Sequence, residues 1–246
     1  MLFTWYNHRG RYHFIKGTFM RNNLKTSIMH ELVRENLTLY YEQEKQAAHA
    51  VLYALETGRN RIAAQLVIAM HPMVHIFVYD DLPTLHEKYE VLYGRKPAEW
   101  VVGTCEGNII LLVSPANPGE DHDFDSLVDV ALHEMAHIYN QQLNASMFIW
   151  IDEGLATFLS NQNPENYGYK IEYCPTFEEM QTNDSTVFAD AEGYALSYFY
   201  IAYLVNTFGW DAVLTLAKTN DYMMAFSRSA QNVYADWIQS LHAKTE

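Results

Sequence analysis

The spacing of apolar residues changes along the chain, and the first change comes near residue 70. Between residues 24 and 69, apolar residues recur every three or four positions, as they do on one face of a helix. A second apolar face covers residues 47–55, and Gly58 is expected to end that helix. We therefore predict a mainly helical region over residues 1–70. Within it, a short strand and turn are predicted at residues 12–17. The first apolar face consists of Ile28, Leu32, Val33, Leu37, Leu39 and Tyr40.

The region that follows, residues 71–162, begins with patterns typical of strands. Continuous apolar runs at residues 73–79 and 100–114 are rich in Val, Ile and Leu and are short enough to be buried strands. Gly107 and Asn108 divide the second run and favour a turn or bulge there. We therefore predict a small sheet in this region.

Helical patterns accompany these strands. A short amphipathic helix is predicted over residues 83–92, ended by Gly94. A longer helix is predicted from Ser126, because Asp129 follows three positions later, a spacing typical of a helix N-terminus.

The remainder, residues 163–246, is predicted to be a helical C-terminal lobe. A helix expected at 152–160 ends the preceding region, and the polar stretch 161–184 follows it. Within the lobe a helix is expected at 189–206, with two or three shorter helices after it. No internal repeat or low-complexity linker interrupts the chain, so we expect one two-lobed unit of the α+β class.

Composition narrows the classes of partner. The 246 residues are 49% hydrophobic, which is ordinary for a globular protein, and 16 Lys and Arg against 30 Asp and Glu give a net charge of −14. Such a surface repels phosphate backbones and anionic lipids, so nucleic acid and acidic membranes are not expected partners. No apolar run reaches the roughly 20 residues of a membrane helix, so no membrane insertion is expected. The oligomeric state stays open.

Two further features favour a cytoplasmic protein. The first residues lack the charged-then-apolar order of a signal peptide. The only cysteines, Cys105 and Cys174, form no C-x-x-C pair, which argues against a disulfide framework or a cysteine metal site.

The predicted long helix contains the motif H-E-x-x-H. On a helix of 3.6 residues per turn, His133 and His137 fall on one face one turn apart, so both imidazoles can reach one ion. Glu134 lies beside them in a position suited to a general base. Read alone, the two histidines also fit a solvated helix face. Glu153, 16 residues after His137, supplies a third ligand, and a catalytic zinc takes three protein ligands and one water.

Together, H-E-x-x-H and the later W-x-x-E-G-x-A resemble the signature of gluzincin metallopeptidases, a group that includes thermolysin-like and aminopeptidase-N-like enzymes. The resemblance covers roughly residues 101–209. It implies a zincin-like, two-lobed domain with a small mixed sheet, an edge strand over the cleft, an active-site helix and a helical C-terminal lobe. It also implies Zn²⁺ as cofactor and a peptide or protein as substrate.

The same resemblance suggests further site residues. The segment from Gly103 to Leu112 is similar to the edge strand that binds the substrate, and Glu106 within it resembles the acid that pairs with a free amine in aminopeptidases. A surface hairpin glutamate is the alternative reading of Glu106. Tyr194 is similar to the tyrosine that stabilises the tetrahedral intermediate, and Tyr198, one turn further on, competes for that role.

We therefore expect a zinc-dependent peptidase in which Glu134 takes a proton from the metal's water and passes it to the leaving amine. Two alternatives stay open. The first is a zinc-binding sensor or regulatory protein with little or no turnover, which the presence of Glu134 disfavours. The second is hydrolysis of a substrate other than a peptide. The sequence does not distinguish an endopeptidase from an aminopeptidase.

Overall fold

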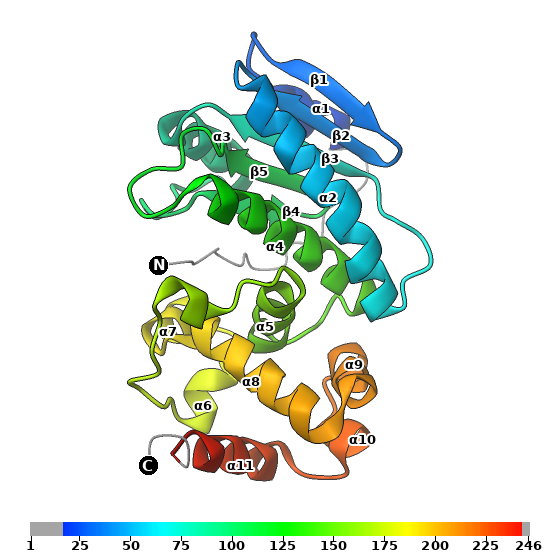
Figure 1. Cartoon of the computed structure of the whole chain (residues 1–246), viewed down its shortest axis with the longest axis vertical. Helices are drawn as coiled ribbons and strands as arrows, with labels where there is room; N and C mark the ends of the chain where they lie inside the picture. Colours follow the sequence, from blue (N-terminus) through cyan, green and yellow to red (C-terminus); the bar gives the residue numbers. More distant parts are fainter. Residues whose placement is uncertain (1–16, 243–246) are drawn as a thin grey trace. The chain divides into compact units, whose positions relative to one another are not determined.

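A computed structural model describes residues 17–242 (Figure 1), and the fold is α+β. The chain divides into two compact units, the first ending at Ile138 and the second beginning at Tyr139. The predicted division at residues 70 and 162 stays a prediction. Within the described residues, no helix combines the length and the apolar character that crossing a bilayer requires.

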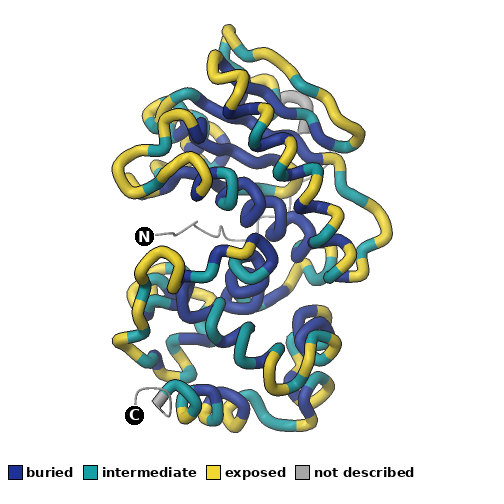
Figure 2. Tube along the Cα trace, in the orientation of Figure 1, coloured by how far each residue is buried: buried dark blue, intermediate teal, exposed yellow. Residues whose placement is uncertain are grey.

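The first unit contains a mixed sheet of five strands in the order β1-β2-β3-β5-β4. β2, β3 and β5 run parallel at the centre, while β1 and β4 pair antiparallel at the two edges. Every residue of β3 and β5 is buried, which accounts for their unbroken apolar sequences (Figure 2). The strands are β1 (His30–Arg34), β2 (Leu37–Tyr41), β3 (Val74–Tyr79), β4 (Gly103–Glu106) and β5 (Ile109–Val113).

Helices cover both faces of this sheet (Figure 1). α2 and α4 lie together on one face, where Gly58 of α2 packs against the side chain of Leu132 of α4. α1 and α3 lie on the other face, and the hydroxyl of Tyr79 in β3 donates a hydrogen bond to the carbonyl of Leu24, the last residue of α1. The helices are α1 (Gly17–Leu24), α2 (Lys45–Leu66), α3 (Leu82–Tyr93) and α4 (Phe124–Leu143).

The second unit consists of helices and connecting loops, with no strand among its described residues. Its core is aromatic: the ring of Tyr200 stacks on Trp150 and on Trp237, with ring centroids 4.6 Å apart in both pairs. Its elements are α5 (Ile149–Leu159), the 3₁₀ helix η2 (Pro164–Tyr167), α6 (Phe177–Met180), α7 (Ser185–Asp190), α8 (Gly193–Phe208), α9 (Trp210–Thr219), α10 (Tyr222–Phe226) and α11 (Ala230–His242).

The structure confirms the strands and helices predicted between residues 71 and 162, but it corrects the region before them. The prediction of a helix through residues 28–40 is wrong, because these residues form the hairpin β1–β2. Glu35 takes a positive φ of 46° at the turn. In β2, Leu37 and Leu39 are buried and Thr38 between them is only half-buried. The strand expected at residues 12–17 lies almost wholly outside the described residues.

Two predicted helix boundaries are also wrong. Gly58 does not end α2, which continues to Leu66; the glycine is retained inside the helix because a Cβ there would lie 2.1 Å from Cδ2 of Leu132. Ser126 does not start α4, because Asp123 caps it instead. The carboxylate of Asp123 accepts from the Ser126 amide at 2.8 Å, and the Ser126 hydroxyl accepts from the Asp123 amide at 2.9 Å.

Candidate metal centre

Helix α4 carries three of the predicted site residues in one buried stretch. His133 and His137 are one turn apart, and Glu134 follows His133 directly. All three side chains are at most 5% exposed. This excludes the alternative of two solvated histidines, because a solvated helix face would be exposed.

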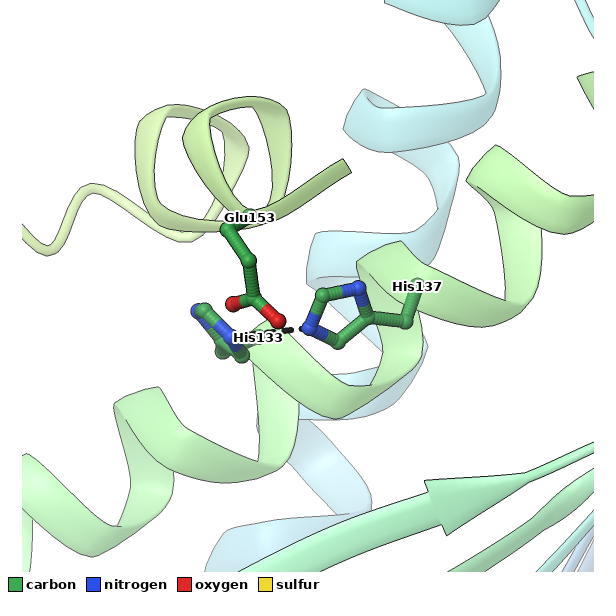
Figure 3. Close-up of side chains that lie close together, drawn as sticks. All are labelled: His133, His137 and Glu153. Carbon is green, nitrogen blue, oxygen red and sulfur yellow. Dashed lines mark hydrogen bonds between the residues drawn. The ribbon is translucent and has the colours of Figure 1, made fainter. Parts of the chain in front are cut away.

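The two imidazoles and the carboxylate of Glu153 form one compact group of donor atoms (Figure 3). One donor atom from each of the three residues lies within 4.8 Å of the others. Nε2 of His133 is 3.0 Å from Nε2 of His137, and the two rings meet at 80°. Two nitrogens that bind one tetrahedral zinc are about 3.3 Å apart, so this spacing is close to that of a ligand pair.

The chemistry of this group fits a bound cation. Imidazole nitrogens with a carboxylate oxygen suit zinc and several other first-row transition ions, and the geometry does not select one of them. Glu153 is 1% exposed, and an ionised carboxylate is costly to bury unless it is paired or coordinates a metal. His133, His137 and Glu153 can therefore hold a metal ion.

Glu134 is not part of the donor group, and it faces the edge strand. A Cβ built on Gly103 of β4 would lie 3.6 Å from Oε1 of Glu134 and 2.6 Å from Cγ1 of Val130. The absence of a side chain at Gly103 thus allows the strand backbone to approach the carboxylate closely. The structure brings these two predicted site residues together.

Glu106 lies on the other face of β4. Side chains alternate along a strand, so Glu106 shares a face with Thr104, whose hydroxyl is 2.8 Å from that of Tyr93 in α3. Burial raises the pKa of Glu106. Burial raises the pKa of Tyr89, while the charge of Arg95 and its hydrogen bond to Tyr89 oppose that rise. Recognition of a substrate amine by Glu106 stays a prediction.

The two candidate tyrosines of α8 have different surroundings. Tyr194 is 5% exposed, and its ring meets that of Phe188 edge-on with centroids 5.0 Å apart. Tyr198 is only half-buried, and its ring lies 6.0 Å from that of Phe158. Burial, followed by the charge of Glu165, raises the pKa of Tyr198. The choice between the two hydroxyls stays a prediction.

Residues that the sequence did not single out hold α5 in place. The amide of Asn140 in α4 donates to the side chain and to the carbonyl of Asp152, the residue before Glu153. Gly154 permits a close approach to α8, since a Cβ there would lie 2.6 Å from the carbonyl oxygen of Ser197. Asn140 follows His137 by three positions, so its place on the same side of the helix was the available signal.

Comparison with known proteins adds no family assignment. No protein-family model matches the chain, and no curated protein sequence matches it. The metal-binding interpretation therefore rests on the geometry and chemistry of the group formed by His133, His137 and Glu153.

Proposed function

We propose that the protein is a zinc-dependent peptidase with a zincin-like arrangement of sheet, edge strand and active-site helix. His133, His137 and Glu153 hold the metal, and Glu134 is the general base. The observation that carries this proposal is the position of Glu134, a buried carboxylate outside the donor group that faces the backbone of β4. A metal site that only stabilises the fold has no use for such a base.

The edge position of β4 supports binding of an extended peptide. β4 is the last strand of the sheet, and no other strand of the described chain pairs with its outer side. A peptide that added there as a further strand would form main-chain hydrogen bonds and would pass Gly103. Its scissile bond would then lie close to the carboxylate of Glu134.

The proposed reaction is hydrolysis of an amide without a covalent enzyme intermediate. When bound, zinc supplies a Lewis acid that acidifies water and polarises a carbonyl. Glu134 removes one proton from the attacking water and returns it to the leaving nitrogen, so the protein regains its starting protonation state. A tyrosine hydroxyl of α8, assigned to Tyr194, donates to the developing oxyanion of the substrate.

An aminopeptidase mode is the finer part of the proposal. It requires Glu106 to pair with the free amine of a substrate whose first residues lie along β4. A carboxylate can pair with an ammonium group, and such pairing would offset the cost of burial that raises the pKa of Glu106. The position of Glu106 on the α3 face of β4 favours cleavage within a chain instead, unless the substrate wraps around the sheet edge.

Cleavage of a mixed peptide library by zinc-loaded protein tests the proposal. We expect wild type to cut peptides and Glu134→Gln to cut them at least about a hundredfold more slowly, the scale of losing a general base. Equal cleavage by both proteins, or none by wild-type protein that holds its zinc, would reject the peptidase and favour a sensor or another substrate. Running the library with free and N-acetylated peptides separates the modes, since only an aminopeptidase requires the free amine.

A further inference from the structure

The first turn of α5 is tied to the last turn of α4 by a fully buried pair of polar side chains. Asn140 is 0% exposed and Asp152 is 1% exposed. Nδ2 of Asn140 donates to Oδ1 of Asp152 at 2.8 Å and to the main-chain carbonyl of Asp152 at 3.1 Å. One amide group thus uses both of its hydrogens on a single residue of the next helix.

This contact requires an amide. Both partner atoms on Asp152 are oxygens that accept hydrogen bonds, so the atom of Asn140 that faces them must be the nitrogen. A hydrogen bond to a carboxylate in a buried site is stronger than one between neutral groups. The orientation of both side chains is therefore fixed.

The pair acts directly on the backbone that presents Glu153. The carbonyl of Asp152 belongs to the same planar peptide unit as the amide of Glu153, so holding that carbonyl fixes the direction in which the chain enters Glu153. Asn140 itself is three residues from His137 on a continuous helix. The contact therefore links the backbone of one donor residue to the helix that carries the other two.

The connection between the two helices is held at its other end as well. The amide of Asn220 donates to the carbonyl of Ser146 at 2.7 Å, and its oxygen accepts from the amide of Phe148 at 3.4 Å. Asn144 donates to the carbonyl of Ala217 at 2.9 Å. The bonds from Asn140 add a contact at the first turn of α5 itself, next to Glu153.

We propose that Asn140 is a positioning residue that sets Glu153 in place for the metal before the metal binds. This inference rests on the metal-binding part of the proposed function but not on peptidase activity. A third ligand that is already in place costs less ordering entropy when the ion binds. Loss of groups that orient metal ligands typically weakens metal binding 10- to 100-fold.

Asn140→Leu tests this role, because the leucine side chain is similar in size to that of asparagine, adds no charge and cannot donate a hydrogen bond. Zinc affinity, measured by competition with a chromophoric chelator, should fall about 10- to 100-fold. The visible spectrum of the Co²⁺-loaded variant should also change, because the carboxylate of Glu153 no longer holds its position. Thermal unfolding of the metal-free protein separates this effect from a general loss of stability.

Asn36→Leu is the matched control. Asn36 also donates from its amide to a main-chain carbonyl, that of His71 at 3.0 Å, but it lies at the β1–β2 turn and far along the chain from the donor residues. Its variant should unfold at a lower temperature and keep wild-type zinc affinity. Wild-type zinc affinity and Co²⁺ spectrum in folded Asn140→Leu would overturn the inference, as would an equal loss of zinc affinity in Asn36→Leu.

An exchanged pair covers the case in which Asn140→Leu does not fold. The double variant Asn140→Asp with Asp152→Asn keeps the net charge and an amide-to-carboxylate bond between the two side chains, but it replaces the bond to the main-chain carbonyl of residue 152 by a contact between two oxygens. Its zinc affinity should lie below that of wild type by several-fold to about tenfold, since one of the two bonds remains. Undiminished affinity would contradict the inference. Absence of zinc binding in wild type would reject the metal site itself.

Discussion

At the scale of single residues, a tyrosine hydroxyl of α8 is the group that the proposed catalysis needs and that metal binding alone does not. Tyr194 is buried and packs edge-on against Phe188, which limits the movement of its ring. Tyr198 is half-buried between the rings of Phe158 and Phe199. A donor that is already oriented stabilises a transition state at little cost of reorganisation, and this favours Tyr194.

Replacing Tyr194 by Phe removes only that hydroxyl. We expect zinc content and fold to be retained and turnover of a peptide substrate to fall roughly ten- to a thousandfold, the range for deletion of one oxyanion donor. Affinity for the substrate should barely change, because the bond strengthens only in the transition state.

Tyr198→Phe is the matched control, and kcat and KM of both variants are measured together. Its kcat should stay near that of wild type. If Tyr198→Phe lost activity and Tyr194→Phe kept it, α8 would still supply the donor but the choice of residue would be wrong; no loss in either variant would exclude both.

The donor residues could be predicted from the sequence, whereas the residues that orient them could not. His133 and His137 are brought together by the helix period alone, and the spacing to Glu153 completes a familiar ligand set. Asn140 and Asp152 find each other only after α4 and α5 are placed by tertiary packing. The helix period places Asn140 on the same side of α4 as His137, but it cannot identify Asp152 as the partner, because Asp152 lies on another helix.

At the scale of elements, the packing of α5 on α8 controls where the third donor lies. Gly154 has no room for a side chain, because a Cβ would lie 2.6 Å from Cγ1 of Ile201 and 2.6 Å from the carbonyl oxygen of Ser197. The carbonyl oxygen of Ser197 belongs to the backbone of α8, so it cannot rotate away as a side chain can. Any larger residue at this position must push α5 and α8 apart.

Gly154→Ala should therefore destabilise the protein by about 1–3 kcal/mol, the usual cost of overpacking a buried contact. Because Glu153 is the preceding residue, zinc affinity should fall as well. Urea unfolding and chelator competition measure the two effects.

Gly168→Ala provides the control for a lost glycine. Gly168 has a φ of 79° with no atom within 4 Å of its Cβ position, so Ala costs about 1 kcal/mol of backbone strain and nothing in packing. Its zinc affinity should stay unchanged. Wild-type stability and zinc affinity in Gly154→Ala would show that α5 and α8 adjust freely.

An element could be predicted from the sequence where its apolar pattern fits only one kind of structure. The buried central strands and α4 were predictable because long apolar or periodic segments have few alternatives. The β1–β2 hairpin could not be predicted from the spacing of apolar residues, because those between residues 28 and 40 also fit a helix. The turn residue with positive φ is Glu35 and not a glycine, so the usual sequence signal of a turn is absent there. Gly58 was misread because a glycine needed for helix packing looks like a helix stop.

At the scale of the whole molecule, a net charge of −14 attracts cations in general. Metal found in the purified protein is therefore informative only if it depends on particular side chains. His133, His137 and Glu153 are buried, so their ion should resist dialysis and high salt, while ions held by surface carboxylates are screened and exchanged. This difference separates the site from the acidic surface.

Zinc content per chain after exhaustive dialysis tests the central claim most directly. We expect one zinc in wild type and in Glu134→Gln, because Glu134 is assigned to the water and not to the ion, and less than about a tenth of that in His137→Ala and Glu153→Ala, which lose one of three ligands. Elemental analysis gives the ratio for all four proteins. Zinc-free wild type, or an undiminished content in Glu153→Ala, would contradict the account.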